Sequence, residues 1–150
     1  MSNPAHLPLA GVRVIEMAQI MAGPTCGMML ADLGAEVIKI EKWPSGDDAR
    51  QYQKPGDNAM PPSFRMINRG KRSLSLDLSQ PEGQAIVRRL AGEADVLVEN
   101  FKVGALARYG LDFCSLSAVN PRLIYCSITG FGQSGPQAQR AGYDAMIQAM

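Results

Sequence analysis

Short apolar runs alternate with amphipathic stretches along the chain, and this alternation predicts strands and helices in turn. Residues 12–17 and 36–41 are rich in Val and Ile, and each is predicted to be a strand. Between them, Gly23-Pro24 opens a predicted helix and Gly34 ends it. The apolar stripe of this helix consists of Cys26, Met29, Leu30 and Leu33. Two strands joined by a helix are typical of a βαβ unit, so we expect a parallel sheet.

The same pattern continues to residue 128. Residues 73–78 alternate strictly between polar and apolar, which predicts a half-exposed or edge strand. Ser79 and Glu82 have the spacing of a capping box, and the helix that follows ends near Gly92. The buried face of that helix is predicted at Gly83, Ile86, Val87 and Leu90. The later predicted elements are a strand at 95–99, a short helix at 105–109, a helix from Asp112 to Asn120 and a strand at 123–128. This order predicts an α/β fold with a doubly wound, Rossmann-like, mostly parallel sheet.

Two stretches do not fit regular elements. Residues 43–72 are rich in proline, and residues 130–142 are rich in glycine and directly follow a predicted strand. Long connections in compact domains usually have a function, and ligands of open α/β sheets bind at the carboxyl ends of strands. Both stretches are therefore candidate walls of a binding site.

Composition narrows the class of protein. The 150 residues contain 15 Lys and Arg against 14 Asp and Glu, a balance that lacks the electrostatic footprint of a duplex-DNA or acidic-membrane binder. The hydrophobic fraction of 46% is too high for a disordered chain. Cys26, Cys114 and Cys126 lie far apart, which favours buried thiols in a reducing compartment, the cytoplasm. We find neither a signal peptide nor a transmembrane run, and we expect no metal site.

The candidate catalytic groups are few. His6 lies in a tail bracketed by prolines and is interpreted as solvated, and without a second histidine no Ser-His-Asp or Cys-His system can be built. Asp144 follows a glycine-rich stretch, where a carboxylate can orient a ligand or exchange protons. The alternative, that Asp144 only caps the helix that follows it, is favoured.

Three motifs can bind anions. Gly130–Gly135 matches the G-x-G-x-x-G pattern, which leaves a dinucleotide-binding domain as an alternative, although Pro136 and the polar run after it favour a tight-turning loop. Residues 68–72 concentrate three cations, and their position at the end of a long loop favours phosphate binding by Lys71 and Arg72 over an ordinary solvated turn. Gly23-Pro24 is either a plain helix start or a place where backbone amides face an anion.

The order of motifs resembles the opening of the class III CoA-transferase (CaiB/BaiF) family over residues 9–150. The matching segments are residues 9–14 (LAGVRV), 22–24 (AGP), 33–41 (LGAEVIKIE), 68–73 (NRGKRS), 76–77 (LD), 95–101 (DVLVENF), 116–122, 130–136 (GFGQSGP) and 142–144 (GYD). No single motif is specific, but their combination and order are.

The resemblance implies an enzyme that moves coenzyme A from an acyl-CoA to a free carboxylic acid. In this family an Asp carboxylate attacks the thioester to give a mixed anhydride, the CoA thiolate returns to form an enzyme–CoA thioester, and the acceptor acid takes the CoA. CoA is substrate, with no tightly bound cofactor, and family members form interlocked homodimers. The nucleophilic Asp is expected beyond Met150, so residues 1–150 are interpreted as an incomplete, N-terminal CoA-binding α/β segment that is inactive by itself.

The resemblance also implies which residues contact CoA. The implied contacts are Met21, Ala22, Lys42, Leu76, Asp77, Leu78, Ser79, Asn100, Phe101, Lys102, Arg108, Arg140, Ala141, Gly142 and Tyr143. Charge clustering adds Lys71 and Arg72, and Asp144 matches an acidic position beside the site. Tyr143 stands where the racemases of this family carry a proton-transferring His, so transferase chemistry is favoured over 2-methylacyl-CoA racemisation.

Overall fold

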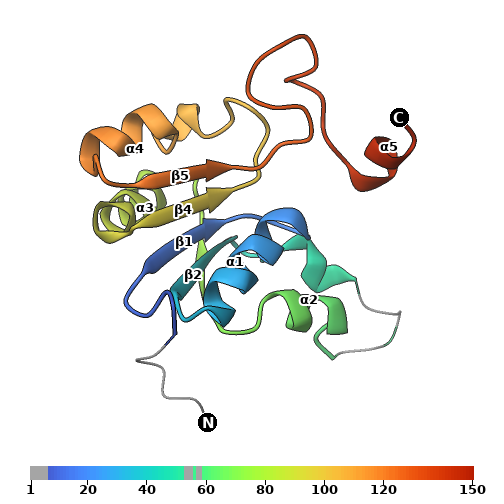
Figure 1. Cartoon of the computed structure of the whole chain (residues 1–150), viewed down its shortest axis with the longest axis horizontal. Helices are drawn as coiled ribbons and strands as arrows, with labels where there is room; N and C mark the ends of the chain where they lie inside the picture. Colours follow the sequence, from blue (N-terminus) through green and yellow to red (C-terminus); the bar gives the residue numbers. More distant parts are fainter. Residues whose placement is uncertain (1–6, 53–55, 57–58) are drawn as a thin grey trace.

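The computed structural model describes residues 7–52, 56 and 59–150, and their core is a single five-stranded parallel sheet (Figure 1). The strands are β1 (Arg13–Met17), β2 (Glu36–Lys42), β3 (Lys71–Leu76), β4 (Val96–Glu99) and β5 (Ile124–Ser127). They lie in the order β3-β2-β1-β4-β5, with every neighbouring pair parallel. The predicted α/β class and parallel sheet are confirmed. The strand order reverses between β1 and β4, which is the usual ligand position in such sheets.

Helices cover both faces of the sheet. They are α1 (Ala22–Asp32), α2 (Pro62–Ile67), α3 (Pro81–Glu93), α4 (Phe113–Val119) and α5 (Asp144–Gln148), with short 3₁₀ turns η2 (Asp48–Gln51) and η3 (Ala107–Tyr109). α1 packs on β1, β2 and β4 and contacts α2, whereas α3 packs on β1 and contacts α4 on the opposite face (Figure 1). The elements η2 and α2 lie within the connection at 43–72 and were not predicted. His6 lies outside the described residues.

The two faces of the sheet have separate cores, because successive side chains of a strand point to opposite sides. Ile15 of β1 packs with Val87 of α3 and Leu116 of α4 in the larger core. Val14, the preceding residue, packs with Val37 and partly buried residues of α1 in the smaller one. The buried residues of the larger core are all apolar, whereas Glu16 and Lys39 are buried on the α1 face.

The apolar stripe predicted for α1 is only half correct. Cys26 and Leu30 pack against the smaller core, but the side chains of Met29 and Leu33 are 59% and 45% exposed. The buried residues of the helix are instead Gly23, Pro24 and Gly27. These small residues bring the helix axis close to the sheet, which turns the larger side chains outward.

The structure corrects two predicted caps. α3 begins at Pro81 with Gln80 as its N-cap residue, and Ser79 lies one position too early and donates its hydroxyl to Asp77 Oδ1 instead. No capping box forms. Asp144 is the first residue of α5 rather than its cap, and its carboxylate accepts from the Gln148 side-chain amide within the helix.

Gly27 of α1 lies against a buried side chain of the sheet. A Cβ atom added to Gly27 would lie 1.9 Å from Glu16 Oε2, a buried carboxylate oxygen that pairs with Lys71. A Cβ added to Gly92, in α3, would lie 3.6 Å from Val119 Cγ1, an ordinary contact. The contact with Glu16 therefore requires glycine at position 27, whereas the space around Gly92 would accept a Cβ atom.

We predict opposite effects of the same substitution at these two positions. Gly27→Ala should lower the free energy of unfolding by about 1–3 kcal/mol, because Glu16 must move from its buried partner. Gly92→Ala should raise it by about 0.5–1 kcal/mol through helix propensity. Urea unfolding of the complete gene product measures both. Equal effects would show that Gly27 is not needed for this approach.

Candidate functional site

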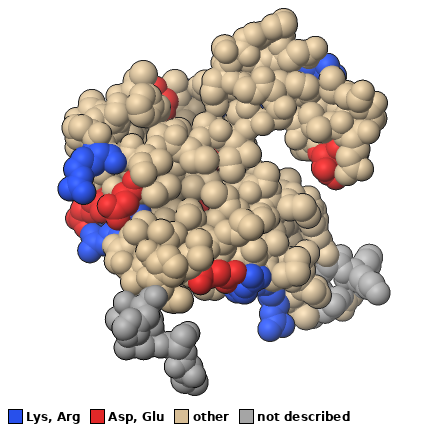
Figure 2. All heavy atoms as spheres, in the orientation of Figure 1, with Lys and Arg blue, Asp and Glu red and all other residues tan. Residues whose placement is uncertain are grey.

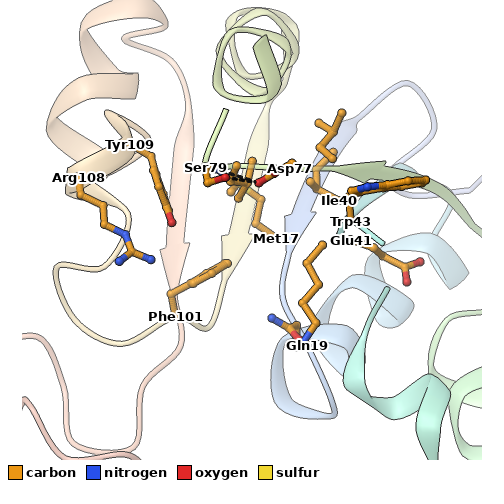
Figure 3. Close-up of a pocket in the computed structure, with 13 residues that line it drawn as sticks. Met17, Gln19, Ile40, Glu41, Trp43, Asp77, Ser79, Phe101, Arg108 and Tyr109 are labelled. Atoms are coloured by element: carbon orange, nitrogen blue, oxygen red, sulfur yellow. Dashed lines mark hydrogen bonds between the residues drawn. The ribbon is translucent and has the colours of Figure 1, made fainter. Parts of the chain in front are cut away.

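A pocket of about 200 Å³ lies at the carboxyl ends of β1, β2 and β3, beside the segment that follows β4 (Figure 3). This edge includes the reversal of strand order between β1 and β4. The lining residues are Met17, Gln19, Ile40, Glu41, Lys42, Trp43, Leu76, Asp77, Leu78, Ser79, Phe101, Arg108 and Tyr109. The pocket thus combines segments from five places in the chain.

Apolar and cationic groups share this pocket. Met17, Ile40 and Leu76 come from strand ends, and they offer aliphatic surface suited to a flat or alkyl group. In Figure 3, Arg108 and Tyr109 form one side of the opening and Trp43 lies across from them. The Arg108 guanidinium carbon lies 4.5 Å from the centre of the Tyr109 ring. Among the described residues Arg108 has no ion-pair partner, so its charge is available to an anion.

Lys42 supplies the second cation, from the end of β2. Its Nζ is paired with Asp48 Oδ1, and both side chains are about half exposed. A surface pair of this kind contributes little free energy and exchanges readily with another anion. Lys42 and Arg108 therefore provide two positive charges at the rim of one pocket.

The structure brings together the central part of the predicted CoA contacts. Lys42, Leu76–Ser79, Phe101 and Arg108 all line the pocket, although they are separated by up to 66 positions in the chain, from 42 to 108. Other predicted contacts are their chain neighbours: Met21 and Ala22 follow Gln19, and Asn100 and Lys102 flank Phe101. These contacts were implied by the family resemblance, and the structure places this part of them at the carboxyl ends of the strands and in the segment that follows β4.

The segment that contains Arg140, Ala141, Gly142 and Tyr143 does not reach this pocket. In Figure 1 the loop at 130–142 projects away from the sheet, and Arg140 lies over the Phe131 ring at 5.4 Å within that loop. Tyr143 is 68% exposed, and the neighbouring Asp144 is exposed in α5. The structure therefore leaves these predicted contacts apart from the rest.

Gly130 and Gly142 lie where two parts of this loop cross. A Cβ atom added to Gly130 would lie 2.4 Å from Gly142 Cα, so the two backbones pass each other too closely for any side chain. No helix follows Gly135 until α5 begins at Asp144. A dinucleotide motif needs its glycines to open a helix, so the tight-turning loop is the correct interpretation of Gly130–Gly135.

Lys71 and Arg72 do not contribute to the pocket. They open β3, whereas the pocket lies at the other end of this strand, roughly 15 Å away at 3.3 Å per residue. Lys71 Nζ is buried and lies 2.6 Å from Glu16 Oε2, and it donates to the Pro24 carbonyl at 2.7 Å. Arg72 pairs with Glu36 on the surface. Charge clustering suggested an anion site, but these cations already have carboxylate partners from other strands.

The structure contains a set of buried charges that was not predicted, and we call it the buried ion cluster: Glu16, Lys39, Asp47 and Lys71. Lys39 Nζ lies 2.8 Å from Glu16 Oε1, 2.8 Å from Asp47 Oδ2 and 2.7 Å from the Ala18 carbonyl. All four side chains are at most 2% exposed. A partial signal was present in the sequence, because Glu16 follows Val14-Ile15 and Lys39 lies between Ile38 and Ile40, and charges that such strands bury must be paired.

Glu41 lies beside the buried ion cluster and is itself held by four hydrogen bonds. Its carboxylate accepts from Arg50 Nε at 2.6 Å, Arg50 Nη2 at 2.7 Å, Ser73 Oγ at 2.6 Å and the Asp47 N–H at 2.9 Å. Burial would raise the pKa of Glu41, but the hydrogen bonds from Arg50, Ser73 and Asp47 outweigh it and lower the pKa to about 2. Glu41 is therefore an anchored anion rather than an acid–base group.

The other surface features of the described residues do not indicate a second binding site. In Figure 2, basic and acidic side chains lie next to each other on the visible face, in keeping with surface pairs such as Arg13–Glu93 and Arg69–Asp32. Within the described ranges, no group of three His, Cys, Asp or Glu side chains is placed to hold a metal ion. None of the helices described is both long enough and apolar enough to cross a bilayer.

Comparison with known proteins gives the family. Residues 9–150 match the family described as CoA-transferase family III. The chain belongs to this family. The match takes in every strand of the sheet and every segment that lines the pocket. The resemblance of the sequence motifs is thereby confirmed.

Relatives in this family share the fold closely. The chain is 55% identical to the succinate–glutarate CoA-transferase of Agrobacterium fabrum, over 95% of this chain and 37% of that protein. It is 43% identical to the human succinyl-CoA:glutarate CoA-transferase, over 95% of this chain and 33% of that protein. The crystal structure of a CaiB/BaiF family protein from Brucella suis matches with a TM-score of 0.90 and 55% identity, over 95% of this chain and 38% of that one. The chain thus spans little more than a third of the length of these relatives.

We predict that the contribution of Glu41 to stability depends on pH. Its folded pKa of about 2 is below the ordinary value of 4.5, so the stabilisation is present above about pH 4.5 and is lost as the pH falls towards 2. The difference in unfolding free energy between wild type and Glu41→Gln should therefore be largest near neutral pH and shrink below about pH 4.5. Urea unfolding of the complete gene product across this range measures it.

Glu93→Gln is the matched control for this prediction. It removes a carboxylate that pairs with Arg13 on the surface, and it should cost less than about 1 kcal/mol. A difference between wild type and Glu41→Gln that stays constant from neutral pH to pH 3 would contradict our assignment of Glu41 as an anchored anion.

Proposed function

We propose that residues 1–150 form the coenzyme A-binding part of an enzyme that transfers CoA from an acyl-CoA to a free carboxylic acid. The observation that carries the proposal is the pocket at the strand ends, where Lys42, Leu76–Ser79, Phe101 and Arg108 meet. The family membership of the chain gives this pocket its ligand class.

The chemistry of the pocket suits one part of CoA. Its volume of about 200 Å³ is below the roughly 300–1,000 Å³ of pockets that enclose drug-sized ligands. It can therefore hold one section of the ligand, the adenine ring or a stretch of pantetheine, against Met17, Ile40 and Leu76. Lys42 and Arg108 at the rim would bind phosphate oxygens by charge-assisted hydrogen bonds. The rest of CoA would run along the strand ends.

The chemical step in this proposal needs a carboxylate that attacks the thioester carbonyl. The acyl group would pass to that carboxylate as a mixed anhydride, with release of the CoA thiolate. The thiolate would then attack the enzyme carbonyl of the anhydride, giving an enzyme–CoA thioester and freeing the donor acid. The acceptor carboxylate would attack this thioester, and the returning thiolate would form the new acyl-CoA and regenerate the enzyme carboxylate. We propose that this nucleophilic Asp lies outside residues 1–150. Asp144 would at most support the site from the loop that carries Tyr143.

The relatives suggest which acids to test. Their names specify succinate or succinyl-CoA together with glutarate, so we propose short dicarboxylic acids as the substrate class. The complete protein would act as an interlocked homodimer. The cysteines are free thiols, but Cys114 is exposed and Cys26 and Cys126 are half-buried, so the expectation of buried thiols is wrong. We propose a cytoplasmic location, where free thiols persist.

The proposal predicts CoA transfer by the complete gene product. Incubation with succinyl-CoA and glutarate should yield glutaryl-CoA and succinate, and residues 1–150 alone should yield neither. Product formation is followed by chromatography of the CoA esters. Exchange of the α-proton of a 2-methylacyl-CoA in D₂O without CoA transfer would instead indicate a racemase. Calorimetric binding of NAD without binding of CoA would overturn the proposal.

Substitution of the two rim cations should weaken CoA binding. Lys42→Ala and Arg108→Ala are each expected to raise the Kd for CoA about 5- to 20-fold, the equivalent of about 1–2 kcal/mol for a charged hydrogen bond. Arg72→Ala is the matched control, because Arg72 is equally cationic but pairs with Glu36 at the start of β3. Isothermal titration of the complete gene product measures all three. An effect of Arg72→Ala as large as that of Arg108→Ala would place the ligand elsewhere.

A further inference from the structure

The loop between β1 and α1 has a backbone conformation that its sequence disfavours. Ile20 has φ +68°, and it is the one non-glycine residue with positive φ in the part of the chain that the structure describes. A β-branched side chain in the left-handed region is a genuine outlier, because its Cβ substituents crowd the backbone. Such conformations persist only where the surroundings impose them, and they concentrate at functional sites.

Two side chains from other segments impose this conformation. Asp47 Oδ1 accepts the Ile20 N–H at 3.0 Å. The side chain of Asn100 binds both backbone groups of Gln19, the residue before Ile20. Its Oδ1 accepts the Gln19 N–H and its Nδ2 donates to the Gln19 carbonyl, both at 2.9 Å. The loop is therefore held from the β2 side by Asp47 and from the β4 side by Asn100.

Both carboxylate oxygens of Asp47 and its backbone N–H have partners. Its Oδ1 also accepts the Ala49 N–H at 2.9 Å, its Oδ2 lies 2.8 Å from Lys39 Nζ, and its own N–H donates to Glu41 Oε2 at 2.9 Å. The residue is 1% exposed. If its carboxylate turned away, Lys39 would lose one of its two carboxylate partners inside the protein, which is costly.

The two segments that Asp47 joins form adjacent walls of the pocket. Gln19 lines it from the β1–α1 loop, and Lys42 and Trp43 line it from the segment that leads from β2 to Asp47. Figure 3 shows Gln19 below the pocket, with Glu41 and Trp43 on the neighbouring strand end. Asp47 does not line the pocket, so it can act only through these neighbours.

We propose that Asp47 is a positioning residue for CoA binding: it holds Ile20 in the left-handed conformation so that Gln19 faces the ligand pocket. This inference rests on the proposed function of the pocket. It assigns the buried ion cluster a role beyond stability, because the cluster fixes the carboxylate that sets the shape of the loop.

The proposal is tested in the complete gene product with Asp47→Ala, Ile20→Gly and the double variant. Asp47→Ala should raise the Kd for CoA about tenfold, because small displacements of binding groups have effects of this size or larger. Adding Ile20→Gly should recover most of that loss, because glycine adopts positive φ without strain. The melting temperature should not recover, since Lys39 remains without its Asp47 partner. The Ile20→Gly single variant completes the cycle.

Two further variants keep the result interpretable. Asp47→Asn retains an acceptor for the Ile20 N–H but loses the charge, so it should lose stability while keeping most of the affinity. Asp32→Ala is the matched control, because it removes a surface partner of Arg69 at the far end of α1 and should leave the Kd unchanged. Loss of affinity in step with loss of melting temperature in every Asp47 variant, without recovery by Ile20→Gly, would overturn the proposal.

Hydrogen exchange separates this proposal from the function of the pocket. The amides of residues 19–21 should exchange faster in Asp47→Ala than in wild type without any ligand present. Unchanged exchange there would overturn the positioning role even if CoA binds. Absence of CoA binding by wild type would overturn the proposed function and, with it, the role of Asp47 in CoA binding, whereas faster exchange would still show that Asp47 holds the loop.

Discussion

Lys39 and Lys71 place two positive charges on the α1 face of the sheet, and much of the structure depends on how these charges are neutralised. Glu16 lies between the two ammonium groups, and Asp47 completes the charge balance from the connection after β2. Desolvation of four charges is costly, and removing one partner costs more than the pair contributes. The cluster thereby links β1, β2 and β3 to the connection that carries Asp47, and it fixes their relative positions.

This requirement explains why the two faces of the sheet differ. The face under α3 and α4 is filled by aliphatic side chains, as is usual for a parallel sheet. The α1 face accommodates the carboxylate of Glu16, and α1 approaches it through Gly27, where any side chain would collide. Gly27 is therefore a consequence of the buried charge of Glu16, whereas Gly23 approaches the apolar side chain of Ala18.

The pocket combines the properties of both faces. Its lining at Met17, Ile40 and Leu76 belongs to the apolar face, and its rim carries Lys42 and Arg108. Glu41, which lines the pocket, and Asp47 behind it hold the neighbouring loops by hydrogen bonds. The segments around the pocket are thus held in place by hydrogen bonds to charged groups. Their positions do not depend on side chains that would occupy the cavity.

Much of this arrangement could be predicted from local patterns, because the periods of strands and helices depend on neighbouring residues only. The alternation of elements determined the parallel α/β sheet. The family resemblance implied Lys42, Leu76 and Phe101 as ligand contacts, and the structure places all three at one pocket. The tertiary structure decided the partners of charged groups. The cluster of cations around Lys71 predicted that this residue binds phosphate. In the structure its charge is instead neutralised in the interior by Glu16, 55 positions earlier. Likewise the left-handed Ile20 depends on Asp47. Pairing of this kind depends on which strands become neighbours, and a local pattern contains no information about that.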